Sequence, residues 1–191
     1  MAATRLMLAL AAPALMLLAP LALAGDAGTS DGETGDHVAD DQRLTAADPA
    51  RIARYLRQLG YRTQMSTDQT GDPWIRLGFA GMEGSVWFND CNDEGADCDS
   101  IRLQVGLLTA GRLTLAQVND FNGRFRFATL SLDEDGDPLL NHDLRLQRPG
   151  VPAALFGWTV QQFESVAAEL RELVNETEPA AAPPDSAAQR D

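Results

Sequence analysis

The stretch WIRLGFAGMEGSVWFN, residues 74–89, decides the fold because its apolar side chains recur with a period close to two. In an extended chain, one side carries Trp74, Arg76 and Gly78 and the other carries Ile75, Leu77 and Phe79. Gly81 separates this run from a second one, residues 83–89. The pattern predicts two antiparallel strands with one buried face and one wetter face.

The same period continues on both sides of this hairpin. Residues 61–67 precede it, before the turn Gly71-Asp72-Pro73, and residues 100–107 follow it, after the acidic segment 90–99. Further along, residues 125–132 and 139–146 form a second predicted hairpin. The segment DEDGDP between them supplies the Asp and Gly residues that tight connections need.

Three helices are predicted around these strands. The first begins at Asp48-Pro49 and ends near Gly60, and the second begins with the capping box TLAQ, residues 114–117, and ends near Gly123. A third helix begins near Pro152, and Gly157 weakens its first turns by about 1 kcal/mol relative to Ala, so a break there stays open. Its apolar stripe consists of Phe156, Val160, Phe163, Ala167, Leu170 and Val174. The predicted order is α-β-β-β-β-α-β-β-α, an α+β fold with helices packed on an antiparallel sheet.

Both ends of the chain differ in composition from the middle. Residues 1–24 carry one charge, Arg5, then an apolar run and the ending ALA, which predicts a signal peptide cleaved after Ala24. Pro13 and Pro20 interrupt the run and argue against a retained membrane anchor. The protein is therefore expected to be periplasmic or secreted. Residues 25–47 are predicted to be a disordered acidic linker and residues 176–191 a disordered tail, which leaves a domain of residues 48–175.

Charge limits the classes of partner. The chain has 15 basic and 28 acidic residues, and removal of Arg5 with the signal leaves 14 against 28, a net charge of −14. It contains no lysine. Because nucleic-acid binding requires a basic surface, nucleic acid is not an expected partner. No later segment is apolar enough to span a bilayer, so no membrane contact is expected after cleavage.

Cys91 and Cys98 flank the loop between the predicted strands 83–89 and 100–107. In an oxidising compartment, two cysteines brought together by a hairpin favour a structural disulfide. A redox role needs the C-x-x-C spacing that lowers a thiol pKa, and this spacing is absent.

Asp133, Asp135 and Asp137 are the weak candidates for a calcium site, since they surround Gly136 in an acidic turn. Aligning Gly136 with the sixth position of an EF-hand puts Ser131 first and His142 last, where a glutamate is required. The EF-hand pattern therefore fails, and a solvated turn is favoured. The acidic segment 90–99 is a second place where a cation would bind only weakly.

No catalytic residue is predicted. His142 is followed by Asp143, but neighbours on a strand point to opposite faces and cannot act as a base and its orienting partner. Arg124 and Arg126 would share one face of a strand and form an anion contact, although pairing with the chain's own carboxylates is favoured. The candidates for lining a ligand pocket are Trp74, Trp87 and Trp158, for which a place in the core is favoured.

Three parts of the sequence together resemble the YbjN family, whose members are described as bacterial sensory transduction regulators. They are the strands around Cys91 and Cys98, the segment VNDFNGRF at residues 118–125, and the turn LDEDGDP at residues 132–138. The resemblance covers residues 48–175. It implies a fold similar to that of type III secretion chaperones, which bind extended protein segments and often form homodimers. It implies no catalytic residue and no cofactor.

These observations predict an exported, non-enzymatic module of the cell envelope that binds a protein partner, as a chaperone or a regulator. The exposed sides of the predicted strands 74–79 and 100–107 are the expected contacts, because a sheet can add an extended peptide by backbone pairing. A periplasmic sensor of a small ligand or cation is the alternative. A hydrolase is the third reading, and the sequence displays no convergent set of titratable groups for it.

Overall fold

The computed structural model describes residues 38, 39 and 41–177. The helices are α1 (Pro49–Gln58), α2 (Leu115–Arg124) and α3 (Ala153–Thr177). The strands are β1 (Arg43–Leu44), β2 (Gln64–Thr67), β3 (Pro73–Phe79), β4 (Met82–Asn89), β5 (Ser100–Gly106), β6 (Thr129–Leu132), β7 (Pro138–Arg145) and β8 (Val151–Pro152). The predicted α+β order is confirmed, with two short strands, β1 and β8, added to it.

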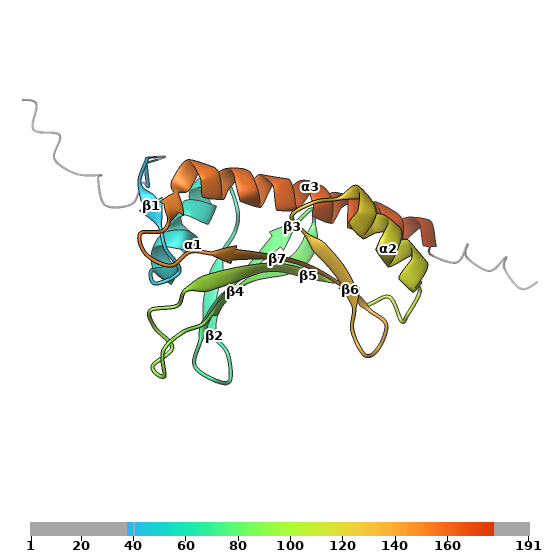
Figure 1. The fold of residues 1–191 in the computed structure, drawn as a ribbon, viewed down its shortest axis with the longest axis horizontal. Helices are drawn as coiled ribbons and strands as arrows, with labels where there is room; N and C mark the ends of the chain where they lie inside the picture. The colour runs from blue at the N-terminus through green and yellow to red at the C-terminus, as the bar shows by residue number, and fades with distance from the viewer. Residues whose placement is uncertain (1–37, 40, 178–191) are drawn as a thin grey trace, which may run out of the picture. The chain divides into compact units, whose positions relative to one another are not determined.

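Six of the strands form one antiparallel sheet in the order β2-β3-β4-β5-β7-β6 (Figure 1). The register of its central pair places Trp74 opposite Trp87 and Leu77 opposite Gly84. Strand β7 pairs with β5 on one side and with β6 on the other, so β6 lies at an edge and α2 connects β5 to it. The remaining strands, β1 and β8, pair with each other as a separate ribbon.

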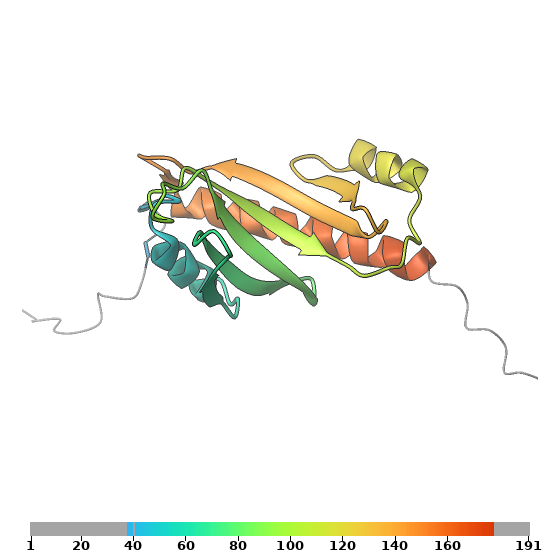
Figure 2. The ribbon, with the colours of Figure 1, turned by 90° about the horizontal axis from the view of Figure 1, so that it is seen from below.

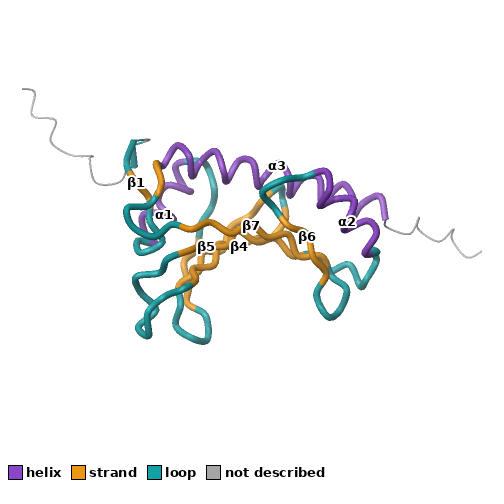
Figure 3. The backbone as a smooth tube through the Cα atoms, in the orientation of Figure 1, coloured by secondary structure: helices purple, strands orange, loops and turns teal. Residues whose placement is uncertain are grey.

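All three helices lie on one side of the six-stranded sheet, as the tube in Figure 3 shows. The alternation expected for residues 74–79 is confirmed, because Ile75, Leu77 and Phe79 are buried under the helices. Phe79 packs edge-on against Phe163 of α3, with ring centroids 4.9 Å apart. Viewed from the opposite side, the strands lie in front of α3 and no described helix covers them (Figure 2).

Local signals account for the ends of the first two helices. The Asp48 side chain accepts a hydrogen bond from the Arg51 amide, and Pro49 follows at the first helical position. Thr114 and Gln117 form the predicted capping box at the start of α2. Helix α2 continues one residue past the expected stop at Gly123 and ends at Arg124.

Helix α3 continues unbroken through Gly157. A Cβ atom at this position would lie 2.9 Å from the Tyr55 hydroxyl oxygen, so the glycine allows α1 and α3 to approach closely. The lower helix propensity of glycine is therefore offset by packing of the Tyr55 ring, which is buried and lies 6.2 Å from the Phe156 ring.

The structured domain extends further in both directions than residues 48–175. The linker prediction is wrong for Arg43 and Leu44, which form β1 and pair with β8, and Leu44 is fully buried. A strand of two residues shows no periodicity, which explains why the sequence pattern missed it. Glu176 and Thr177 end α3 rather than begin the tail. The predicted signal peptide, the rest of the linker and the tail from residue 178 lie outside the described residues.

The strand predicted over residues 125–132 begins only at Thr129. Phe127 has a positive φ of 69°, which an extended strand does not allow. The Asn122 side chain instead holds the loop end in place: it accepts a hydrogen bond from the Leu130 amide and donates one to the Leu130 carbonyl. The start of β6 is therefore set by a side chain of α2.

Within residues 38, 39 and 41–177, none of the helices has the length and apolar character that crossing a membrane requires.

Candidate functional site

The face of the six-stranded sheet opposite the helices carries the candidate site, and it is called the open face below. It is formed by the side chains that alternate with the buried ones on β3, β4, β5 and β7. These are Trp74, Arg76, Trp87, Arg102, Gln104, Asn141 and Asp143, and Ser85 lies on the same face but is itself buried. The open face is thus the wetter side predicted for residues 74–79 and 100–107.

A stacked pair of indole rings forms the largest apolar feature of the open face. Trp74 and Trp87 are directly opposite each other in the β3–β4 register, and their ring centroids lie 5.0 Å apart at an interplanar angle of 17°. Both side chains are only half-buried. Because directly opposite residues on one face are close, the register itself brings the two rings together.

Shallow depressions flank this pair. One, of about 590 Å³, lies towards the β2–β3 turn and is lined by Trp74, Trp87 and residues 67–70. The other, of about 420 Å³, lies towards β5 and is lined by the same rings with Ser85, Gln104 and Leu108 among others. Leu108 is 92% exposed. The Trp pair therefore offers apolar surface on both sides to an incoming side chain.

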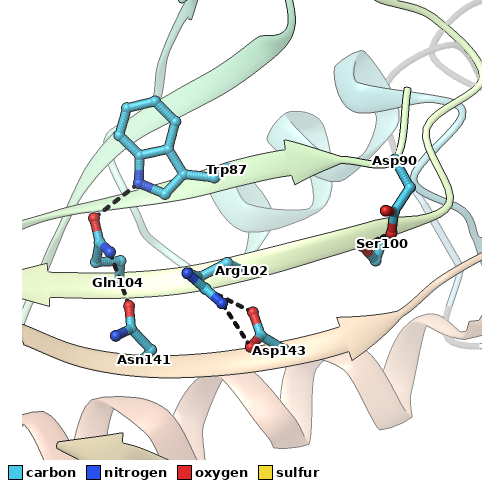
Figure 4. A network of polar contacts seen from close by, with 7 residues as sticks. All are labelled: Trp87, Asp90, Ser100, Arg102, Gln104, Asn141 and Asp143. Atoms are coloured by element: carbon cyan, nitrogen blue, oxygen red, sulfur yellow. Dashed lines mark hydrogen bonds and ion pairs between the residues drawn. The ribbon is translucent and has the colours of Figure 1, made fainter. Parts of the chain in front are cut away.

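A row of amides continues from the Trp pair across the sheet (Figure 4). The Trp87 Nε1–H donates to Gln104 Oε1 at 3.0 Å, and Gln104 Nε2 donates to Asn141 Oδ1 at 2.8 Å. The three residues lie on β4, β5 and β7, which are neighbours in the sheet. These bonds fix the orientation of the Trp87 ring and of both amide groups.

Internal ion pairs neutralise the charges beside this row. Arg102 donates two hydrogen bonds to the Asp143 carboxylate, at 2.7 and 2.9 Å (Figure 4). The Asp143 carboxylate raises the pKa of the Arg102 guanidinium above its usual range. Arg76 also pairs with Glu83, with both of its hydrogen bonds to the single oxygen Oε1. The centre of the open face therefore presents indole rings and amides rather than a net charge.

Two loops form the wall beside Trp74. In the β2–β3 turn, Asp68 Oδ1 accepts hydrogen bonds from the Thr70 hydroxyl and from the Thr70 and Asp72 amides, which lower the pKa of the Asp68 carboxyl. The β4–β5 loop packs against this turn so closely that a Cβ atom at Gly95 would lie 2.4 Å from the Gly71 carbonyl oxygen. Gly95 also has a positive φ of 68°.

A disulfide joins Cys91 and Cys98 at the base of the β4–β5 loop. The Cys98 side chain is buried and Cys91 is half-buried. Within the loop, the Asn92 side chain accepts hydrogen bonds from the Glu94 and Ala96 amides. The cross-link therefore lies next to an ordered loop that supports the wall of the Trp depression.

The structure does not bring Arg124 and Arg126 together on a strand. Arg124 is the last residue of α2 and forms an exposed ion pair with Asp120, 3.5 Å away. Arg126 lies in the following loop, with its guanidinium 5.4 Å from the centre of the Phe127 ring. The alternation assumed for an anion contact is wrong because residues 125–128 are not a strand.

The acidic turn between β6 and β7 has four carboxylates, and two of them accept backbone hydrogen bonds, Asp133 within the turn and Asp137 from the loop after β5. Asp133 Oδ1 accepts from the Asp135 and Asp137 amides, and Asp137 Oδ1 accepts from the Thr109 and Ala110 amides. The hydrogen bond from the Thr109 amide, and those that accompany it, lower the pKa of the Asp137 carboxyl. The described part of the chain contains no group of three or more His, Cys, Asp or Glu side chains arranged to hold a metal ion.

His142 and Asp143 point to opposite faces of β7, as expected. The imidazole lies on the core side, 6.5 Å from the Phe163 ring, and burial lowers its pKa. On the same side, the Tyr61 hydroxyl donates to Glu164 Oε2 at 2.8 Å, and burial with this carboxylate raises the pKa of the Tyr61 hydroxyl. Glu164 also accepts from the Ala80 amide, so it joins the β3–β4 turn to α3.

The sequence interpretation missed the Trp pair as a surface feature. The preference for a core position is wrong for Trp74, Trp87 and Trp158, the last of which is 77% exposed on α3. The sequence did contain a signal, because residues separated by an even number of positions on a strand share a face. Trp74 therefore shares a face with Arg76, and Trp87 with Glu83. Parity should have outweighed the usual preference of large rings for the core.

Comparison with solved structures returns four similar chains, two of which are described here. A crystal structure of an uncharacterized protein from Methanothermobacter thermautotrophicus has a TM-score of 0.47 at 11% identity, covering 68% of this chain and 97% of that chain. The Yersinia pestis type III secretion chaperone SycH, solved in complex with a stable fragment of YscM2, has a TM-score of 0.37 at 17% identity, covering 66% and 95%. No curated protein sequence matches the chain.

The family comparison covers nearly all of the domain described above, without β1. Residues 48–176, from the cap of α1 to the last turn of α3, match the family described as "YbjN: Putative bacterial sensory transduction regulator". This range agrees with the residues on which the resemblance was based. The chain therefore belongs to the YbjN family.

Proposed function

We propose that this chain is a non-enzymatic, protein-binding module that holds an extended segment of a partner protein at its open face. The observation that carries the proposal is the half-exposed Trp74–Trp87 pair, flanked by a depression on each side. Tryptophan is enriched among the residues that dominate the energy of protein interfaces. The bidentate Arg102–Asp143 pair leaves little net charge around it.

The edge strand β2 supplies the backbone part of the proposed site. All four of its residues are exposed, and its only partner among the described strands is β3. An extended segment can add to such an edge by pairing with its free amides and carbonyls. Ser66 of β2 lies directly opposite Trp74, so a long side chain of the added segment would reach the depression beside that ring.

Export is part of the proposal. The amino-terminal 24 residues have the composition of a cleavable signal, and two cysteines in one hairpin suit an oxidising compartment. We therefore place the module in the periplasm or outside the cell, where the partner would be another envelope or secreted protein. A small-ligand or cation sensor lacks a comparable supporting observation among the described residues.

Site-specific photo-cross-linking tests the proposal. Gln104→p-benzoylphenylalanine places the reactive group on the open face, beside the Trp pair, and Trp158→p-benzoylphenylalanine places it on α3 as a control. In the native host, the Gln104 position should cross-link to one defined segment of a partner. The added substitution Trp74→Ala should remove that product.

The control decides between a specific site and general adhesion. Equal products from the Gln104 and Trp158 positions would contradict the open face as the binding site. Absence of any protein product at the Gln104 position, in cells that accumulate the folded chain, would contradict the binding function itself.

A further inference from the structure

Positive charge is concentrated in one part of this acidic chain. Residues 49–67 contain four arginines and no aspartate or glutamate, whereas the whole chain has a net charge of −13. This part comprises α1, the connection after it and β2. The four residues are Arg51, Arg54, Arg57 and Arg62.

Elsewhere, several arginines of the described residues pair with carboxylates of the chain itself. These pairs include Arg76–Glu83, Arg102–Asp143, Arg124–Asp120, Arg148–Asp97 and Arg171–Glu172. Arg57 instead donates to a neutral group, the Thr63 hydroxyl, at 2.9 Å. Within the described residues, the Arg62 guanidinium has neither a hydrogen bond nor an ion pair. Arg43, Arg126 and Arg145 likewise have neutral partners, so Arg57 and Arg62 are distinguished by their place beside the edge strand β2 rather than by the lack of a carboxylate.

Arg57 and Arg62, called the edge arginines below, both precede the start of β2. Helix α1 ends at Gln58, and Arg57 reaches the segment that leads into the strand through its bond to Thr63. Arg62 lines a depression of about 380 Å³ together with Thr63, Arg76 and Glu83 among others, and Arg76 neutralises the Glu83 carboxylate. The planar guanidinium group fits a carboxylate by two parallel hydrogen bonds.

We propose that the segment held at β2 is acidic and that the edge arginines bind its carboxylates. This inference rests on the proposed function and names the chemistry of the partner. A basic segment would meet two unneutralised like charges at the start of the strand. An acidic segment paired with β2 would be attracted by these two guanidinium groups. Repulsion from the more distant carboxylates of the chain is largely screened beyond about 8 Å at physiological ionic strength. The edge arginines would thereby select the partner and set its register.

A different role for charged side chains on an edge strand is to prevent pairing with other chains. The two roles predict opposite results. If the edge arginines only protect the edge, their removal would increase self-association and leave the affinity for acidic and neutral peptides equal.

Fluorescence anisotropy with designed peptides separates these roles. The probe is a short fluorescein-labelled peptide of alternating glutamate and valine, and the matched probe has glutamine in place of every glutamate. The purified chain should bind the glutamate probe more tightly by about two- to thirtyfold, the range for two exposed ion pairs. The preference should shrink as salt is raised.

Charge-matched variants locate the effect. The double variant Arg57→Gln/Arg62→Gln should bind both probes equally. The control Arg124→Gln/Arg126→Gln removes the same charge from the other candidate anion contact and should keep the preference. Loss of the preference only in the control would overturn the inference, as would failure of the wild-type chain to bind the glutamate probe.

Two further results are distinguishable from these. Equal binding of both probes by the wild-type chain overturns the acidic partner but leaves the proposed function, which loss of binding in Trp74→Ala tests separately. Binding of the glutamate probe only after Asp26, Asp31, Glu33 and Asp36 are changed to amides would identify the chain's own acidic segment as the occupant. That result would overturn the assignment of an external partner.

Discussion

Reduction of the Cys91–Cys98 disulfide is expected to weaken both the fold and the wall of the Trp depression. The two cysteines are separated by 7 residues in sequence. For a loop of this length, the chain-entropy relation gives a loss of about 2.4 kcal/mol in the free energy of unfolding. For a domain of this size the corresponding fall in melting temperature is roughly 8 °C.

The effect should spread to the neighbouring turn because Gly95 packs against the Gly71 carbonyl. Residues 67–70 of that turn line the larger depression beside Trp74. We therefore expect faster amide hydrogen exchange over residues 66–72 in the reduced protein, in addition to faster exchange in the loop itself. The carboxyl-terminal half of α3 should exchange at an unchanged rate.

Urea unfolding of the oxidised and reduced wild-type chain measures the first quantity without changing any side chain. The denaturant slope also tests whether reduction changes the compactness of the unfolded state. Free energies of unfolding that agree within about 0.5 kcal/mol would refute the cross-link as a constraint. Unchanged exchange over residues 66–72 would refute the proposed link between the disulfide and the Trp depression.

Three other predictions concern single positions. Gly157→Ala should lower the free energy of unfolding of the wild-type chain, because the nearest clash of the new Cβ atom is with the Tyr55 hydroxyl. In a Tyr55→Phe background the loss should be smaller by about 1 kcal/mol or more. Equal losses in urea unfolding of both backgrounds would contradict this. Burial lowers the pKa of His142, so the unfolded state takes up the proton first, and stability should fall as the pH drops below about 6.5 and level off below the folded pKa. The stability of His142→Gln should lack this pH dependence. Stability curves of the wild type and the variant that run parallel from pH 7.5 to 5 would contradict the prediction. Mass spectrometry of the protein purified from its host should find a chain beginning at Gly25, whereas an intact amino terminus would contradict export by a cleaved signal.

Much of the fold could be predicted from local patterns. Alternation in residues 74–79 and 100–106 identified the buried face, and the caps at Asp48 and Thr114 located two helix starts. These signals depend on neighbours in sequence, which the chain displays directly. Strand β1 could not be found this way, because burial of Leu44 depends on pairing with Val151, more than a hundred residues later.

The candidate site depends on non-local register, and this limited its prediction. The parity of Trp74 and Trp87 was readable, but their stacking follows from the β3–β4 pairing. The hydrogen bond from Gln104 to Asn141 requires β5 to pair with β7 rather than with β6, the next strand in sequence. Arg57 and Arg62 were visible as charges, yet only the structure separates them from arginines that have carboxylate partners.

The binding of a partner segment at the Trp pair is the central claim, and one titration tests it most directly. The segment identified by cross-linking from the Gln104 position would be synthesised and titrated calorimetrically against wild-type, Trp74→Ala, Trp87→Ala and Trp158→Ala chains. The account predicts that each of the first two variants loses at least about tenfold in affinity, as expected for buried interface tryptophans, while Trp158→Ala binds like the wild type. Unchanged affinity in both open-face variants, with their folds intact by circular dichroism, would contradict it.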